Sequence, residues 1–298
     1  MRRNLSLRLS GAITPLVTPF RHGALDIKAL EMLAEWQIAS GIGALAVGTV
    51  TGEGPTLSQA ECDKVLSAVL RVAGDRIPVL AATGTNCTAK TIEATRRAEA
   101  LGASAALVTV PYYSKPGQKG ILHHFGELAA VTNLPLIIVN DPARTASPLL
   151  PSTLDVLSAD GTIFGLLDIE GDMATLACCR DRLHLFTGNA LGAPAFLACG
   201  GDGVIAPVGN VLPKLVTSLQ HAAACVNLPA ALTLADRMTA LIDAIGGDPA
   251  CIKYALSAYP GIGADVRLPL VAADDASREA VAAALMPFAA TPKRALSL

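Results

Sequence analysis

The chain has 298 residues, of which 52% are hydrophobic and 16% are charged, a composition that suits one large domain or a barrel with a short appendage. The formal net charge of −2 provides no basic surface for nucleic acid or an anionic membrane, so we expect the partner to be a small molecule or another protein. The longest apolar runs, such as 134–139, are far shorter than the roughly 20 residues that cross a bilayer, and Arg8 interrupts any signal-peptide core. We therefore predict a cytoplasmic protein without a membrane span.

The sequence contains no recognisable cofactor motif. The 7 cysteines include no C-x-x-C pair, which argues against a disulfide framework and against a zinc site. There is no phosphate-binding P-loop and no Gly-x-Ser-x-Gly elbow. We predict that the protein uses neither a cofactor nor a metal.

Short runs rich in Val, Ile, Leu and Ala alternate along the chain with segments of helical periodicity, a pattern typical of parallel βαβ units. Because these runs are apolar throughout, both faces of each strand must be covered, as they are in a barrel ringed by helices. The sequence therefore predicts an α/β fold, a (β/α)8 TIM barrel. The eight predicted strands are Ala12–Thr18, Ala44–Gly48, Pro78–Ala82, Ala105–Val110, Leu136–Asn140, Ile163–Leu167, Leu185–Gly188 and Gly203–Pro207.

The intervening helices are marked by their stop signals, a glycine just beyond the last turn or a nearby proline. After the eighth strand, three further helices exceed what a barrel needs for closure. We divide the chain into a barrel (1–213) and a segment (214–298) that closes the barrel and adds a C-terminal three-helix extension. The predicted helices are Asp26–Ser40, Ser58–Ala73, Thr88–Leu101, Lys119–Thr132, Lys214–Cys225, Ala230–Ile245 and Pro249–Ala258.

Candidate functional residues follow the strands, because such barrels carry their chemistry at the C-terminal strand ends. In the loop 49–58, backbone amides and threonine hydroxyls can hold a carboxylate, or the loop is an ordinary turn with Ser58 as N-cap. Tyr112 and Tyr113 are adjacent in a chain with only 4 tyrosines, and they either relay protons and bind a ligand or pack at a subunit contact. Arg144 either meets a carboxylate or lies exposed in a turn.

These segments, in this order and spacing, resemble the dihydrodipicolinate synthase and N-acetylneuraminate lyase family, and the similarity runs over nearly the whole chain. The resemblance implies a class I aldolase-type barrel, in which a lysine of the sixth strand forms a Schiff base with pyruvate or a related 2-oxo acid. The motifs that carry it are Thr14–Phe20, Thr51–Glu53, Gly84–Asn86 with Thr88, Pro111–Pro116, His124 with Phe125, Asn140, Pro142, Arg144 with Thr145, Gly171 with Asp172, Gly203–Ile205, Asn210, Val211, Pro213, Lys253 and Arg267–Leu270.

The chain departs from the family pattern at the residues that carry the chemistry. The stretch 165–172 places Leu167 at the position of the Schiff-base lysine, and leucine cannot form an imine. The relay tyrosine of the fifth strand falls on Val139. The relay threonine falls on Val50, unless Gly48 and Thr49 keep the family register with one residue inserted. Of the relay, the resemblance then retains Tyr113, which in the family enters the site of a neighbouring subunit.

The resemblance also implies a pocket and an assembly. It assigns Thr51, Gly52, Glu53, Arg144 and Ile205 to the binding of a small 2-oxo acid or related carboxylate. Because members of the family are usually homotetramers built from dimers, it further implies a homo-oligomer, either a dimer or a tetramer.

Acidic residues have gathered near the expected site. Asp141, Asp168 and Glu170, together with Glu53, can in principle hold a divalent cation that polarises a 2-oxo acid in place of an imine. The alternative is that these acids cap loops or face solvent. Asp168 and Leu167 are neighbours on one strand, so only one of the two side chains can point into the barrel.

Three functions remain open from the sequence. The first, which we favour, is a catalytically silent barrel that binds a ligand or a protein partner. The second is a lyase or hydratase that acts on a small carboxylate without a lysine, through Tyr113 and the acids. The third is a conventional pyruvate-dependent lyase with a substitute amine from Lys115 or Lys253.

Overall fold

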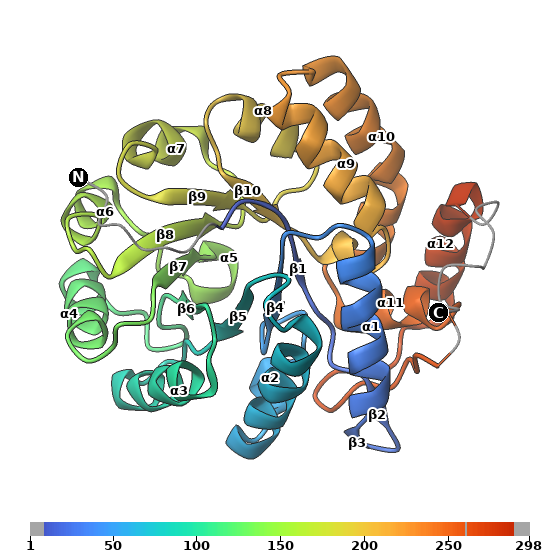
Figure 1. Cartoon of the computed structure of the whole chain (residues 1–298), viewed down its shortest axis with the longest axis horizontal. Helices are drawn as coiled ribbons and strands as arrows, with labels where there is room; N and C mark the ends of the chain where they lie inside the picture. The colour runs from blue at the N-terminus through green and yellow to red at the C-terminus, as the bar shows by residue number, and fades with distance from the viewer. Residues whose placement is uncertain (1–8, 260, 289–298) are drawn as a thin grey trace.

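Eight parallel strands close into a barrel in the computed structural model, which describes residues 9–259 and 261–288. Around the barrel the strands follow the order β1-β10-β9-β8-β7-β6-β5-β4, and helices surround them (Figure 1). This arrangement confirms the predicted (β/α)8 barrel. The barrel strands are β1 (Gly11–Pro15), β4 (Ala44–Val47), β5 (Val79–Ala82), β6 (Ala105–Thr109), β7 (Leu136–Asn140), β8 (Ile163–Asp168), β9 (His184–Thr187) and β10 (Gly203–Ile205). A two-stranded hairpin, β2 (Phe20–Arg21) and β3 (Ala24–Leu25), follows β1.

The outer helices begin at caps that the sequence encodes. Ser58 starts α2 with a capping box, in which its side chain accepts from the Glu61 amide while the Glu61 carboxylate accepts from the Ser58 amide. The helices around the barrel are α1 (Ile27–Ala39), α2 (Gln59–Ala73), α3 (Thr88–Leu101), α4 (Gln118–Ala129), α5 (Pro142–Thr145), α6 (Pro151–Leu157), α7 (Met173–Cys179), α8 (Ala193–Ala198) and α9 (Pro213–Ala224), with short 3-10 turns at η1 (Gly54–Thr56) and η2 (Pro207–Asn210). Helices α5 to α8 were not predicted, because runs of four to seven residues are too short to show helical periodicity.

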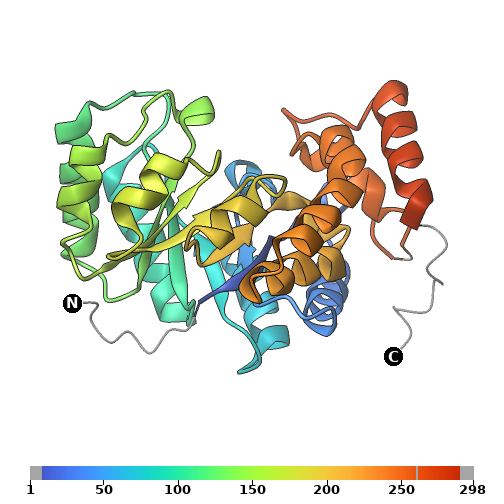
Figure 2. The same cartoon turned by 90° about the horizontal axis from the view of Figure 1, so that it is seen from above.

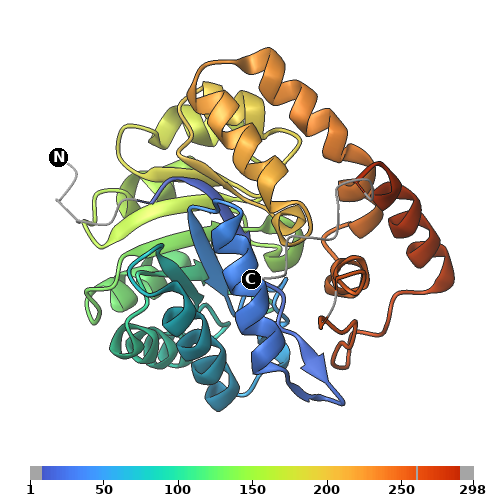
Figure 3. The same ribbon diagram turned by 45° about the vertical axis from the view of Figure 1, so that its right-hand side comes forward.

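The C-terminal segment both closes the barrel and extends it. Helix α9 contacts β1 and α8, while α10 (Leu228–Ile245), α11 (Pro249–Leu256) and α12 (Asp275–Leu285) contact one another outside the ring, before the short turn η3 (Met286–Phe288). Figures 2 and 3 place α12 at the outer edge of the molecule, away from the strands. Helix α12, which was not predicted, is capped by Asp274. None of the described helices is long and apolar enough to cross a bilayer.

Aliphatic and aromatic side chains fill the inside of the barrel. Because side chains alternate along a strand, each strand sends one set of residues inward and the other toward the helices. Phe186 on β9 is fully buried in this interior, and Phe164 lies at the beginning of β8. The inner cluster is Leu9, Ile13, Ala44, Ala46, Leu80, Ala105, Leu107, Ile137, Phe164, Leu167, Phe186 and Ile205, with Ala82, Val139 and Ile169 packed against it.

We expect the Phe186→Ala substitution to lower the free energy of unfolding by about 3–5 kcal/mol, because it leaves a cavity in this cluster. Leu150, which is 47% exposed, offers a matched control, and Leu150→Ala should change the value by less than about 0.5 kcal/mol. Urea denaturation followed by circular dichroism, at one fixed protein concentration, measures both. Equal losses in the two variants would contradict this account of the barrel interior.

Candidate active site

Three neighbouring strands present a row of inward side chains near the C-terminal end of the barrel. Thr109 on β6 pairs in register with Val139 on β7, and Val139 pairs in turn with Leu167 on β8. Both Val139 and Leu167 pack with the inner cluster, and Leu167 is only 4% exposed. The two positions that the family resemblance assigns to the lysine and the tyrosine are therefore side by side, inside the barrel and aliphatic.

Asp168 points away from the barrel interior. Its Oδ1 accepts hydrogen bonds from the backbone amides of Gly171 (2.8 Å) and Asp172 (3.1 Å), and its Oδ2 accepts from the side-chain amide of Asn140 (2.8 Å). Since Leu167 occupies the interior, the alternation of the strand leaves Asp168 to fix the loop that follows β8.

The other two acids near this site lie in different surroundings. Asp141 is the N-cap of α5, accepting from the Arg144 amide, and it also forms an ion pair with the Arg144 side chain at 3.4 Å. Glu170 is exposed. In residues 9–259 and 261–288 no group of three or more His, Cys, Asp or Glu side chains is arranged to hold a metal ion.

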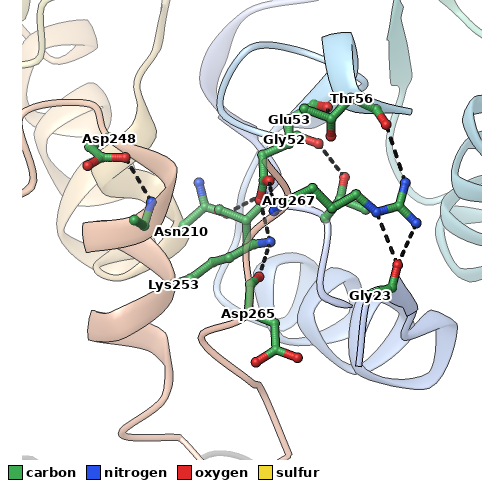
Figure 4. A network of polar contacts seen from close by, with 12 residues as sticks. Gly23, Gly52, Glu53, Thr56, Asn210, Asp248, Lys253, Asp265 and Arg267 are labelled. Carbon is green, nitrogen blue, oxygen red and sulfur yellow. Dashed lines mark hydrogen bonds and ion pairs between the residues drawn. The ribbon is translucent and has the colours of Figure 1, made fainter. Parts of the chain in front are cut away.

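Glu53 forms the centre of a buried polar network (Figure 4). Its Oε1 accepts from the Lys253 amine of α11, and its Oε2 accepts from the Arg267 amide at 2.9 Å. The Lys253 amine also donates to the Asp265 carbonyl at 2.7 Å and lies 4.1 Å from the centroid of the Phe20 ring. Both side chains of the Glu53–Lys253 pair are completely buried. Burial lowers the pKa of the Lys253 amine, and the hydrogen bond to Glu53 opposes that shift.

Arg267 continues this network toward α2. Its guanidinium forms two hydrogen bonds to Glu61 (2.6 and 2.9 Å), donates to the Gly23 carbonyl and lies over the same Phe20 ring at 4.3 Å. The hydrogen bonds from Arg267 lower the pKa of the Glu61 carboxyl to about 2. The network therefore ties the loop after β4 to the C-terminal extension.

The lysines that the structure describes lie outside the eight barrel strands. None of the eight barrel strands, all of which are described, contains a lysine. Lys253 does lie beside the loop that contains Thr51, but its amine is enclosed and already bonded to Glu53 and Asp265. Lys115 is exposed in the loop after β6, with a positive φ of 46°.

The residues predicted to bind the ligand occupy several environments. Thr51 is 7% exposed, and its hydroxyl forms no hydrogen bond within the described part of the chain. The backbone at Gly52 packs closely, because a Cβ there would lie 2.7 Å from the Leu16 carbonyl oxygen. Ile205 is inside the barrel, whereas the Arg144 side chain is 57% exposed. Tyr113 is 89% exposed and takes a positive φ of 67°, so its ring projects from the molecule.

Sequence reasoning missed two contributors to this region. Phe20, whose ring faces both Lys253 and Arg267, falls within a motif that was noticed but given no role. Thr109 was not singled out, although it is the polar member of the inward row. Counting the strand alternation forward from Leu107, which is inside, would have identified it.

The fold and this strand-end site define a TIM-barrel protein of the class I aldolase type. The family model of the dihydrodipicolinate synthetase family matches residues 8–287, and the chain belongs to that family. It is 40% identical over 282 residues to the 4-hydroxy-tetrahydrodipicolinate synthase of Roseobacter denitrificans, covering 92% of this chain and 97% of the relative. The enzyme of the same name from Rhizorhabdus wittichii is 41% identical over 283 residues, covering 93% and 97%.

Solved structures agree with this assignment. The chloride-inhibited dihydrodipicolinate synthase of Acinetobacter baumannii, complexed with pyruvate, superimposes with a TM-score of 0.91 at 34% identity, covering 93% of this chain and 98% of that one. A monomeric dihydrodipicolinate synthase variant superimposes with a TM-score of 0.89 at 33% identity, covering 93% and 95%.

The buried pair is testable by a double-mutant cycle. Lys253→Met and Glu53→Gln should each lower the free energy of unfolding by about 3–5 kcal/mol, because each leaves a buried partner without its counter-charge, and the double variant should lose less than the sum. The exposed pair of Arg71 with Glu31 is the control, and Arg71→Met and Glu31→Gln should be coupled by less than about 1 kcal/mol. If the losses in unfolding free energy of Glu53→Gln and Lys253→Met simply add in the double variant, the coupling is refuted.

The contact between Arg267 and Glu61 predicts that the free energy of unfolding depends on pH. Glu61 has a lower pKa in the folded chain than its ordinary value of 4.5, so its contribution is complete above pH 4.5 and is lost as the pH falls toward about 2. Wild type should exceed Glu61→Gln in stability by on the order of 1–2 kcal/mol near neutral pH, after allowance for solvent screening, and the gap should shrink below pH 4.5. A gap that stays constant in urea titrations down to pH 3 would contradict the assignment.

Proposed function

We propose that this chain binds a small 2-oxo acid or a related carboxylate at the C-terminal mouth of the barrel and does not form the imine on which a conventional aldolase of this type depends. The observation that carries the proposal is the identity of the two inward neighbours, Leu167 and Val139. Neither side chain can serve as a nucleophile or transfer a proton. The proposed protein is a ligand-binding or catalytically silent paralogue of the family's synthases.

The surroundings support loss of imine chemistry rather than a relocated nucleophile. A catalytic amine must be held within roughly an ångström of its productive geometry, and none of the barrel strands supplies one. Lys253 is the lysine beside the Thr51 loop, and freeing its amine would leave Glu53 as an unpaired buried charge. The substitute-amine function is therefore the less favoured alternative.

Retention of carboxylate binding is proposed from two residues. Thr51 is 7% exposed and its hydroxyl has no hydrogen-bond partner among the described residues, so it is available as a donor. Arg144, which is exposed and pairs with Asp141, provides a cation just after β7. A relative of 34% identity is complexed with pyruvate, which supports a ligand of that class here. A lysine-independent lyase or hydratase that uses Tyr113 and the acids remains the second candidate, although Asp141 and Asp168 are occupied in capping a helix and fixing a loop.

We further propose a cytoplasmic homo-oligomer, a dimer or a tetramer. The exposure of Tyr113, at 89%, supports this, since a ring projecting so far is suited to a subunit contact. A monomer at micromolar concentration in sedimentation velocity would reject the oligomer.

The decisive test of the proposed function is borohydride reduction in the presence of pyruvate, read by intact-mass spectrometry, beside a thermal-shift titration with pyruvate and related carboxylates. We expect no reduced adduct and a rise in melting temperature with carboxylate. An adduct on the wild-type chain would show that another lysine performs the imine chemistry and would overturn the proposal.

Restoring the two groups tests the assignment of the positions. The double variant Leu167→Lys with Val139→Tyr should give a borohydride-trapped pyruvate adduct, because the amine and its proton relay return to neighbouring inward positions. Val156→Lys, on an exposed position of α6, is the matched control for a new lysine and should give no adduct. Circular dichroism confirms folding of each variant, and a folded double variant without an adduct would count against the assignment.

A further inference from the structure

Aliphatic groups make up much of the inner wall at the C-terminal end of the barrel. Ala82, Val139 and Ile169 are half-buried and pack on the inner cluster from β5, β7 and the end of β8. Leu167, in register with Val139, is only 4% exposed. Thr109, in register with Val139, is the polar neighbour on the β6 side. A ligand that enters here therefore meets hydrocarbon on the side where Leu167 stands.

Hydrocarbon discriminates between a ketone and a methylene. A ketone oxygen held against Val139 and Leu167 gives up its hydrogen bonds to water without replacement, which is unfavourable. A methylene at the same place loses only contact with water and gains from burial. With leucine at 167 and valine at 139, neither position can form an imine or donate a hydrogen bond to a 2-oxo group.

We infer that the mouth selects an aliphatic monocarboxylate and discriminates against the corresponding 2-oxo acid. The inference rests on the proposed function, because it takes the carboxylate end to be held near Thr51 and the second carbon of the ligand to lie beside Leu167. Of the two neighbours Val139 and Leu167, Val139 is the more exposed. It is therefore the specificity-determining residue. A longer aliphatic chain gains further contact with Ala82 and Ile169.

Isothermal titration with matched pairs of acids tests this selection. One pair is pyruvate and propanoate, and the other is 4-methyl-2-oxopentanoate and 4-methylpentanoate. In each pair we expect the acid without the oxo group to bind at least about fivefold more tightly, which is the lower end of the cost of one unpaired polar group in such a site. Across the pairs, affinity should rise by up to about fourfold per additional buried methylene.

Isosteric variants locate the origin of the discrimination. Val139→Thr places a hydroxyl at the wall with little change of shape and should shift the affinity ratio at least about threefold toward the 2-oxo acid. Val156→Thr, 59% exposed on α6, introduces the same group elsewhere and should leave the ratio unchanged. Thr109→Val should change the affinity for both acids of a pair by the same factor. A selective loss of the 2-oxo acid in Thr109→Val would mean that Thr109 serves the ketone, and the inference would fail.

The outcomes separate the inference from the function on which it rests. Tighter binding of the 2-oxo acids by the wild-type chain, without a borohydride adduct, overturns the inference and leaves the proposed carboxylate site standing. Absence of binding by all four acids, or a trapped adduct, overturns the proposed function and the inference with it.

Discussion

The buried ion pair between Glu53 and Lys253 is the interaction on which the mouth of the barrel depends. Removing two charges from water is costly, and the pair is tolerated because the Arg267 amide and the Asp265 carbonyl satisfy the remaining hydrogen-bonding groups. These contacts join segments 200 and 214 residues apart in sequence. The C-terminal extension is thereby part of the structure that positions Thr51, rather than an appendage. The ion pair fixes the position of this loop more than it adds to the net stability of the fold.

A second constraint is the alternation of side chains along a strand, which gives neighbouring residues of β8 different surroundings. Leu167 faces the interior beside Val139, and Asp168 faces outward to the loop amides at 171 and 172. An acid that looked in sequence like a gained catalytic group is in fact a loop anchor. Of the two neighbours, only Leu167 contributes to the inner wall of the barrel, and it contributes hydrocarbon.

Local sequence information was sufficient for the barrel but not for the network. Continuous apolar runs predicted all eight strands, and Ser58 as N-cap predicted the beginning of α2. Strand periodicity predicted that Leu167 and Asp168 point to opposite sides of the strand. Only the register with β7 shows that Leu167 is the one that faces inward. The partner of Glu53 was not predicted, because a buried charge pair is specified by contacts between distant segments that no local pattern encodes. Glu53 was assigned to ligand binding, and in the structure both its carboxylate oxygens already have partners.

The aliphatic row also explains how such a barrel stays stable if its imine chemistry has been abandoned. A lysine amine and a phenol inside a barrel need hydrogen-bonding partners or water, and groups of this kind are kept there at a cost in stability when activity requires them. Once the requirement is lifted, leucine and valine continue the packing already present around Phe186 and Ile205 without any buried group to satisfy. The loop that contains Thr51 is held by the separate Glu53 network, so its position does not depend on the residues at 139 and 167. The position of the Thr51 loop and the chemistry of the inward row are thus set by different contacts, so a change in one need not alter the other.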